Sequence, residues 1–295
     1  MHEPPSEPSS PFEIIEPREL VAPVVLNSPH SGAHYPPHFL ASTRLDPLSL
    51  RRSEDAFVDE LFRPAAELGV PLMRALFPRA FLDLNREAYE LDPRMFDGRL
   101  PSYANTRSLR VAGGLGTIAR IVGDSQEIYA GRLPVQEALH RIETFYQPYH
   151  QALARLLGRI RSQFGTVILI DCHSMPSTGS QREERHRADI VLGDRYGTSC
   201  SPALTGFAEV TMKGLGLSVS RNAPYAGGYI TEFYGRPVAG THALQIEINR
   251  ALYMDEKRHE RIAGFDALAA KLQTFAEQLI AFSRHEIDGR RVAAE

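Results

Sequence analysis

Short runs of β-branched and aliphatic residues alternate along this chain with longer segments in which apolar residues recur at helical spacing. Apolar runs bounded by Gly, Pro, Asn or Asp are typical of β-strands. We predict strands over residues 24–27, 71–75, 80–84, 167–171, 189–193, 217–220 and 243–248. Because helical segments separate these strands, we expect an α/β fold, a three-layer α/β/α sandwich with a mostly parallel central sheet.

Helical periodicity marks three further segments. Residues 54–68 carry one apolar stripe, and Ser53 before them is suited to cap a helix. A longer helical region follows Pro134, since proline fits the first turn of a helix, and Pro148 inside this region predicts a kink or a break. The last apolar stripe covers residues 262–282.

Two parts of the chain depart from this rhythm. Residues 1–12 are rich in Pro, Ser and Glu, which predicts a disordered or loosely ordered tail. Residues 85–131 hold several glycines and little periodicity, and a long loop region in a compact domain usually carries function. We therefore expect one hydrolytic α/β domain over residues 13–295, with a loop-rich substrate-binding insertion around residues 85–131.

The composition excludes several classes of partner. The net charge of −3 argues against nucleic acid, because phosphate backbones select basic surfaces. No apolar run approaches the ~20 residues that span a bilayer, and the first residues lack the pattern of a secretory signal. The 2 cysteines form no disulfide framework, which fits a reducing cytoplasm. We expect a cytoplasmic protein without a nucleic-acid or membrane partner; the composition leaves both a monomer and a homo-oligomer open.

Two of the predicted strands are followed by a histidine. The run TVILIDCHS, residues 166–174, ends near His173, and PVVLNSPHSG, residues 23–32, carries His30 just after its strand. Ligands gather at the carboxyl ends of strands in open α/β sheets, so both imidazoles can share one rim. Imidazole is the commonest transition-metal ligand in proteins, and the pattern indicates a metal-dependent hydrolase. The alternative for each is a core histidine bonded to the backbone, or a residue of a turn.

A hydrolytic metal site uses three protein ligands and keeps one position open. Asp55 is the candidate third ligand and Glu54 its substitute, both at the start of the helix predicted over residues 54–68. Acidic residues in a first helical turn also complement the helix dipole, so a purely structural role is the alternative.

The strand ALQIEIN, residues 243–249, contains a candidate general base. Its apolar residues alternate with Gln245, Glu247 and Asn249, which therefore share one face. A carboxylate in an apolar strand is costly to bury unless it is paired or working, and burial raises its pKa toward that of a base at neutral pH. Glu247 is the candidate; an edge strand, or a pair with Arg250, is the alternative.

The motif DLNR, residues 83–86, suits a small anionic substrate. Arg86 can bind a carboxylate by two parallel hydrogen bonds, and the amide of Asn85 can donate a third. A helix cap at Asn85, with Arg86 either solvated or paired to Asp83, is the alternative. Cys172 offers a rival nucleophile, but adjacent strand residues face opposite ways, so this thiol does not easily meet the histidine beside it.

Six motifs resemble those of the N-formylglutamate amidohydrolases. They are SPHSG at 28–32, DLNR at 83–86, DCHSMPS at 171–177, ADIVLGDRYG at 188–197, YAGGYIT at 225–231 and HALQIEINRALYMDE at 242–256. The resemblance covers most of the chain between Val24 and Glu256. It implies hydrolysis of N-formyl-L-glutamate to formate and L-glutamate in histidine degradation, and kinship with the fold of the zinc carboxypeptidases and aspartoacylase.

The resemblance also implies roles for single residues. Carried onto this sequence, the metal ligands are His30, Asp55 and His173, the general base is Glu247, and the carboxylate-binding pair is Asn85 and Arg86. Zinc is the implied metal, with cobalt as the alternative. The zinc carboxypeptidases have His-x-x-Glu as their first ligand motif, whereas no carboxylate follows His30 at that spacing. Asp55 is therefore an inference rather than a direct match.

Formylglutamate has two carboxylates, so the resemblance requires a second cationic group. Arg120 is our candidate, with Arg107 and Arg110 as competitors, and a Gly-Gly-Tyr turn containing Gly228 and Tyr229 can let backbone approach the substrate. Two other functions remain open: a metal-dependent deacylase of another N-acyl amino acid, and a metal-free binding protein of the same fold.

Overall fold

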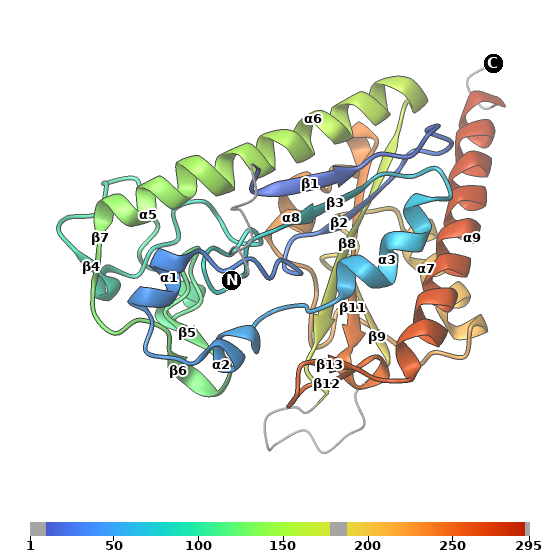
Figure 1. Cartoon of the computed structure of the whole chain (residues 1–295). Coiled ribbons are helices and arrows are strands. Elements are labelled where there is room, and N and C mark those ends of the chain that lie inside the picture. Colours follow the sequence, from blue (N-terminus) through green and yellow to red (C-terminus); the bar gives the residue numbers. More distant parts are fainter. Residues whose placement is uncertain (1–9, 178–187, 293–295) are drawn as a thin grey trace. The chain divides into compact units, whose positions relative to one another are not determined.

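The structure is a computed structural model that describes residues 10–177 and 188–292 (Figure 1). Its contacts divide the chain into two compact units. Residues 1–13, 29–56 and 74–152 form the first unit, and residues 14–28, 57–73 and 153–295 form the second. The tail predicted over residues 1–12 falls mainly outside the described residues. The single domain over residues 13–295 stays a prediction.

A seven-stranded sheet with the order β1–β3–β2–β8–β11–β9–β10 is present in the described residues. β2 runs parallel to β8, β8 to β11, and β9 to β10, whereas β9 and β11 are antiparallel. The expected α/β fold with a mostly parallel sheet is confirmed. The strands are β1 (Phe12–Ile15), β2 (Val24–Ser28), β3 (Leu72–Ala75), β8 (Val167–Met175), β9 (Ile190–Gly193), β10 (Val219–Arg221) and β11 (Thr241–Asn249).

The strand predicted over residues 80–84 is wrong. This run forms turns in which the Phe81 N–H donates to the Pro78 carbonyl and the Asp83 N–H to the Thr117 carbonyl. Its apolar side chains are nevertheless fully buried. Burial explains the apolar run, and burial alone does not distinguish a strand from a tightly packed turn.

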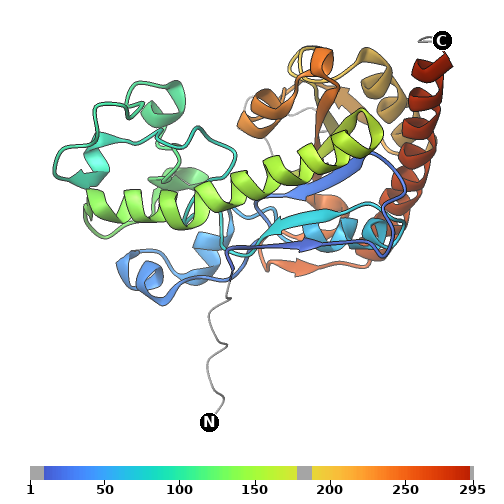
Figure 2. The same ribbon diagram turned by 90° about the horizontal axis from the view of Figure 1, so that it is seen from above.

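Helices of the second unit pack on the sheet. They are α3 (Val58–Ala66), α7 (Pro202–Gly214), α8 (Tyr229–Tyr234) and α9 (Gly264–Val292). α8 contacts β11, and α9, the long red helix in Figure 2, packs on α3 and α7. Phe207 of α7 stacks on Phe282 of α9 with ring centroids 4.4 Å apart. A short hairpin, β12 (Met254–Asp255) and β13 (Glu260–Arg261), follows β11.

The helix predicted from residue 54 begins later, and Ser53 is not its cap. α3 starts at Val58, and the residue before it, Phe57, has a left-handed backbone with φ 65°. A long-range hydrogen bond explains the delay, because the Asp55 N–H donates to the carbonyl oxygen of His30 over 3.0 Å. This bond holds the segment before α3 in a turn.

The long helical region after Pro134 is interrupted, as predicted, but one turn before Pro148. A π-helical segment (Ile142–Tyr146) separates α5 (Val135–Arg141) from α6 (Gln147–Phe164). Proline has no N–H to offer the preceding turn and its ring crowds that turn, so the regular helical pattern fails just ahead of it. Pro148 itself sits in the first turn of α6.

The first unit is built from short elements around an aromatic cluster. These elements are α1 (Pro37–Ser42), α2 (Pro47–Arg51), α4 (Leu109–Ala112), β4 (Phe96–Asp97), β5 (Ile121–Val122), β6 (Gln126–Glu127) and β7 (Leu133–Pro134). Arg141 is fully buried in the cluster, 4.2 Å above the ring of Phe81, and bonds the Tyr129 hydroxyl. Cation–π contact and hydrogen bonds together keep this charge inside.

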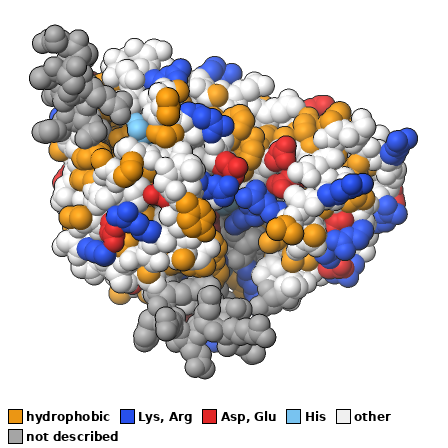
Figure 3. Space-filling view, turned by 180° about the vertical axis from the view of Figure 1, so that it is seen from behind, with side chains coloured by type: hydrophobic (Ala, Val, Ile, Leu, Met, Phe, Trp, Pro, Cys, Tyr) orange, Lys and Arg blue, Asp and Glu red, His pale blue; other side chains and the backbone are white. Residues whose placement is uncertain are grey.

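Figure 3 shows arginine, lysine and acidic side chains interspersed with apolar ones. Among the described helices, none combines the length and the hydropathy needed to cross a membrane.

Candidate metal centre and active site

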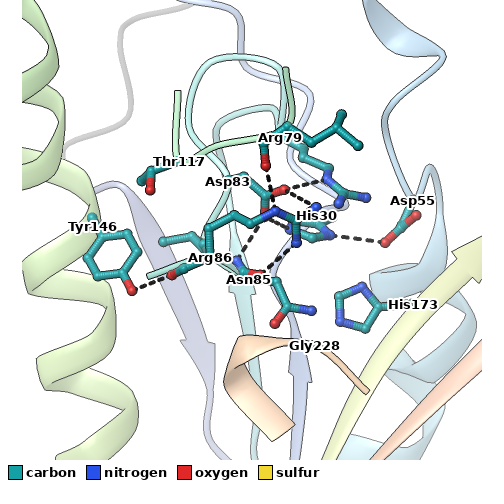
Figure 4. Close-up of polar contacts among 12 residues, drawn as sticks. His30, Asp55, Arg79, Asp83, Asn85, Arg86, Thr117, Tyr146, His173 and Gly228 are labelled. Atoms are coloured by element: carbon teal, nitrogen blue, oxygen red, sulfur yellow. Dashed lines mark hydrogen bonds and ion pairs between the residues drawn. The ribbon is translucent and has the colours of Figure 1, made fainter. Parts of the chain in front are cut away.

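His30 lies in a turn directly after β2 and is buried. The turn is tight, since a Cβ at Gly32 would overlap the carbonyl oxygen of Phe77. The ring of His30 contacts two carboxylates: Nδ1 lies 3.3 Å from Oδ2 of Asp55, and Nε2 lies 2.8 Å from Oδ1 of Asp83 (Figure 4). Both carboxylates are buried with it.

Asp83 stays ionised in spite of its burial. Desolvation disfavours its charge, but the guanidinium groups of Arg79 and Arg86 outweigh this effect and hold its pKa well below the usual value. An ionised carboxylate accepts hydrogen bonds only, so Nε2 of His30 must carry the proton. In the neutral ring, Nδ1 then carries the lone pair on the side of Asp55, where it can act as a metal ligand.

His173 repeats this arrangement on β8. Its Nε2 lies 2.9 Å from Oδ2 of Asp171, two residues earlier on the same face of the strand. The other oxygen of Asp171 accepts a hydrogen bond of 2.8 Å from the side-chain amide of Asn27 on β2. With Nε2 turned to Asp171, Nδ1 is the nitrogen that His173 presents for a ligand bond.

His30, Asp55 and His173 form a buried group in which one ligand atom from each lies within 4.8 Å of the others. This group can bind a metal ion. Two imidazole nitrogens and one carboxylate oxygen are a common three-ligand set for a catalytic metal. In addition, each histidine has a carboxylate on its other ring nitrogen, the arrangement that orients metal-binding imidazoles in proteins.

Glu247 lies on β11, directly beside His173 of β8 in the register of the two strands. Its Oε1 accepts a hydrogen bond of 2.8 Å from the amide of Gln245. β11 lies between β8 and β9, so the alternative of an edge strand is wrong. The guanidinium of Arg250 bonds Ser174 over 3.0 Å. Glu247 is 7% exposed, and its carboxylate is therefore held in a largely dry setting.

Asn85 and Arg86 follow Asp83 in a turn, and no helix begins there. Arg86 donates to the carbonyl oxygens of Leu115 and Asn85 over 2.7 and 2.8 Å, and one of its nitrogens lies 3.5 Å from Asp83. Burial lowers the pKa of this guanidinium to about 10, so it remains charged at neutral pH. The contact with Asp83 that we considered as an alternative is thus present, and Arg86 is rigidly held (Figure 4).

The remaining candidates have other partners. The carboxylate of Glu54 accepts hydrogen bonds from Tyr35 and Arg51, and Glu54 is not a member of the buried metal-binding group. The N–H of Gly228 donates to Gln245 over 2.7 Å. Tyr229, the first residue of α8, stacks on Phe233 with ring centroids 5.2 Å apart.

Arg120 lines an arginine-rich cavity of about 200 Å³. It bonds Asp92 and Glu127, each over 3.2 Å. Of its competitors, Arg107 is exposed, and Arg110 lies 3.7 Å from a carboxylate oxygen of Glu90. The cavity is lined by Arg44, Arg94, Met95, Arg120, Glu127, Tyr129, Gly131 and Arg132. Neither Asn85 nor Arg86 belongs to this lining.

Cys172 is fully buried on the face of β8 opposite to His173. Burial, reinforced by the neighbouring Asp171 charge, raises the pKa of this thiol well above its usual value. A thiol that resists deprotonation is a poor nucleophile. The rival mechanism of thiolate attack therefore lacks support.

Three polar residues around the histidines and Glu247 had no assigned role in the sequence analysis, namely Asn27, Asp171 and Gln245. Asp83 appeared there only as a partner of Arg86, and its contact with His30 was not predicted. Asp171 and Gln245 could have been found, because each precedes a candidate residue by two positions in a strand and so shares its face. The role of Asp83 could not have been found, because residues 80–84 look like a strand in the sequence, whereas the structure has turns there.

Comparison with known proteins gives consistent similarities. The family model for N-formylglutamate amidohydrolase matches residues 22–254. The chain is 30% identical over 267 residues to an N-formylglutamate deformylase of Pseudomonas aeruginosa, covering 89% of this chain and 94% of that protein. It is 29% identical over 261 residues to one of Pseudomonas putida, covering 88% and 91%.

Two solved structures share the fold. The crystal structure of an N-formylglutamate amidohydrolase from Ralstonia eutropha JMP134 has a TM-score of 0.89 and 36% identity, covering 94% of this chain and 99% of that one. A gene product of Agrobacterium tumefaciens has a TM-score of 0.65 at 18% identity, covering 92% and 96%, and this likeness concerns the fold alone.

Proposed function

Because this chain belongs to the N-formylglutamate amidohydrolase family, we propose that it hydrolyses N-formyl-L-glutamate to formate and L-glutamate. One observation carries the proposal: the family match spans residues 22–254, and the buried His30, Asp55 and His173 group falls within it. A protein that only binds its ligand would not need a general base such as the buried Glu247 next to His173.

We propose zinc as the resident metal, with cobalt as a substitute. His30 and His173 would hold it through Nδ1, since Nε2 of each ring faces a carboxylate, and Asp55 would supply the third ligand. Such an ion, when bound, lowers the pKa of water from 15.7 to about 7 and polarises an amide carbonyl. The donor set of two nitrogens and one oxygen fits this ion.

Glu247 is the proposed general base. It takes a proton from the attacking water as the oxygen bonds to the formyl carbon, and it returns the proton to the amine as the C–N bond breaks. The immediate products are formic acid and the amine of glutamate. At neutral pH the proton of formic acid passes to the amine, which gives formate and the ammonium group of glutamate, so atoms and charges balance. The hydrogen bond from Gln245 to Oε1 of Glu247, 2.8 Å long, limits the orientations of this carboxylate.

Asn85 and Arg86 are the proposed ligands of one substrate carboxylate. Two nitrogens of Arg86 are fixed by backbone carbonyl oxygens, which reduces the entropy lost when the guanidinium binds an anion. Arg120 stays the candidate for the second carboxylate, and Gly228 with Tyr229 for contact with the rest of the substrate. We also propose that the loop-rich residues 85–131 supply part of the substrate-binding wall.

We propose that the protein works in the cytoplasm as one domain over residues 13–295. Both cysteines, Cys172 and Cys200, are free and buried, as expected where no disulfides form. The partner is a small anionic N-acyl amino acid.

A substrate panel tests the function. Protein purified without chelator is supplied with zinc or cobalt and assayed for amine release from N-formyl and N-acetyl derivatives of glutamate, aspartate, leucine and alanine. We expect N-formylglutamate to give the highest kcat/KM. Preference for an acetyl or a neutral substrate would instead indicate a deacylase of another N-acyl amino acid. Absence of bound metal, with no turnover after metal addition, would indicate a binding protein.

A further inference from the structure

Three buried polar side chains form a row across the centre of the sheet. Asn27 of β2, Asp171 of β8 and Gln245 of β11 are aligned in the strand register and are 0%, 0% and 4% exposed. The opposite face of the same strands at this depth is mainly apolar, with Leu26, Ile170, Leu244 and Ile246 beside Ser28 and Cys172. Buried polar groups without a task are replaced by apolar ones at little loss of stability, so this row requires an explanation.

The next row toward the strand ends contains His173 and Glu247, which are also paired in register. Each is bonded by the residue two positions earlier on its own strand. Asp171 lies 2.9 Å from Nε2 of His173, and the amide of Gln245 donates to Oε1 of Glu247 over 2.8 Å. On both strands, therefore, a buried polar residue forms a hydrogen bond with the polar residue two positions later on the same face.

The orientation of the Gln245 amide is determined by its surroundings. Its Oε1 accepts the backbone N–H of Gly228 over 2.7 Å and the hydroxyl of Thr231 over 3.3 Å. A backbone N–H only donates, so the amide oxygen must face Gly228 and the NH2 group must face Glu247. Gln245 is thus a fixed donor aimed at one oxygen of the candidate base.

Asn27 does the same for the other strand. Its NH2 group donates to Oδ1 of Asp171 over 2.8 Å, which leaves Oδ2 of Asp171 for His173. The carboxylate cannot rotate without losing one of these two bonds. Asn27 therefore sets the direction in which Asp171 meets the imidazole.

From this geometry we infer that Gln245 and Asn27 are positioning residues: Gln245 orients Glu247, and Asn27 orients His173 through Asp171. The inference rests on the proposed function for the identity of the reaction. It adds that Gln245 and Asn27 affect different measurable properties of the protein. Loss of the Gln245 bond affects turnover, whereas loss of the Asn27 bond affects metal affinity.

Gln245→Met tests the first half, because it keeps the length and volume of the side chain and removes both polar groups. We expect kcat to fall about 10- to 100-fold, with KM and zinc content near those of the wild type. Thr241→Val is the matched control, since Thr241 is the first residue of β11 and lies on the same face of the strand, four residues before Gln245. A kcat within about twofold of this control would overturn the inference.

Thr231→Val provides a milder variant in case Gln245→Met folds poorly. It removes only the 3.3 Å bond to Gln245 and keeps the side-chain shape. We expect kcat to fall about two- to fivefold, the loss of a single weak hydrogen bond, with an unchanged melting temperature. Where Gln245→Met does not fold, an unchanged kcat in a Thr231→Val protein that folds normally would reject the role of Gln245.

Asn27→Leu tests the second half by a readout that needs no substrate. Competition with a chromogenic chelator should show a zinc affinity about 10-fold or more below that of the wild type, whereas Gln245→Met should bind zinc normally. Equal zinc affinity of Asn27→Leu and the wild type would overturn this half. If the wild type binds zinc but does not cleave N-formylglutamate, the proposed function fails, while the metal-affinity comparison still decides the role of Asn27.

Discussion

The two histidines of the candidate metal centre are supported by the same chemistry on different kinds of backbone. His173 and its carboxylate, Asp171, lie two residues apart on one strand, so strand geometry alone puts them on one face. His30 meets Asp83, 53 residues later, through two turns that are neither helix nor strand. Loop backbone has no regular register, so side-chain bonds must bring His30 and Asp83 together. Strand backbone already places Asp171 and His173 on one face, and the side-chain bond from Asn27 sets only the direction of the Asp171 carboxylate.

Those bonds are ionic and buried. Asp83 lies 2.9 Å from Nε of Arg79 and 3.5 Å from Arg86, whereas Asp171 is bonded by the neutral amide of Asn27. Removing one partner of a buried ion pair leaves a charge without compensation, and removing one partner of a neutral pair does not. Asp83 and Asp171 thus have the same role toward a metal-binding imidazole, but we expect Asp83 to contribute more to the stability of the fold.

The largest expected effect is that of a substitution of Glu247, which lies on β11 beside His173. Glu247→Gln keeps the shape of the side chain but removes its ability to accept a proton. We expect kcat to fall about 10²- to 10⁴-fold, the usual contribution of a general base. Zinc content, measured by mass spectrometry of the dialysed protein, should stay near one ion per chain. Unchanged turnover would remove Glu247 from the mechanism, and lost zinc would make it a ligand instead.

The next prediction compares the two carboxylates directly. Asp83→Asn and Asp171→Asn should each lower zinc affinity about 10- to 100-fold, because each weakens the support of one imidazole. Chelator competition measures this effect. The Asp83 substitution should also destabilise the metal-free protein by about 3 kcal/mol, since it leaves the charge of Arg86 buried without its partner.

Urea denaturation of the two metal-free variants sharpens this comparison. We expect a clearly lower midpoint for Asp83→Asn than for Asp171→Asn. Equal midpoints would show that the ion pairs at Asp83 contribute nothing beyond the hydrogen bond to His30. Equal stability together with unequal zinc affinity would place the difference in the metal centre and not in the fold.

These differences also explain which parts could be predicted from the sequence. Alternation in β8 and β11 predicts the sheet and the shared face of Gln245 and Glu247, because strand geometry is local. The start of α3 could not be predicted, since the bond from the Asp55 N–H to the His30 carbonyl joins distant segments. The turn at Asp83 was missed for the same reason, because its bonds to Thr117 and His30 leave no periodic pattern.

A smaller effect is expected at Arg86, which lies on the loop side of the comparison. Lysine keeps the charge but cannot bond the Leu115 and Asn85 carbonyl oxygens while presenting two further parallel donors. Arg86→Lys should raise KM for N-formylglutamate about 10-fold or more with a smaller change in kcat. Arg159→Lys, at an exposed pair with Glu16, is the control. Equal KM values in these two variants would separate Arg86 from the substrate.

The smallest effect is expected at Cys172, which lies between Asp171 and His173 but faces the other side of the sheet. Its thiol is buried and its pKa is raised well above the usual value, so it remains protonated at neutral pH and reacts slowly with iodoacetamide. Cys172→Ala should therefore leave kcat and zinc affinity unchanged, with a loss of stability of about 1 kcal/mol from the small cavity. A large loss of turnover in a folded, zinc-loaded Cys172→Ala protein would mean that Cys172 and His173 do not face opposite sides of the sheet. The distinction between His173, placed by a strand, and His30, placed by a turn, would then no longer hold.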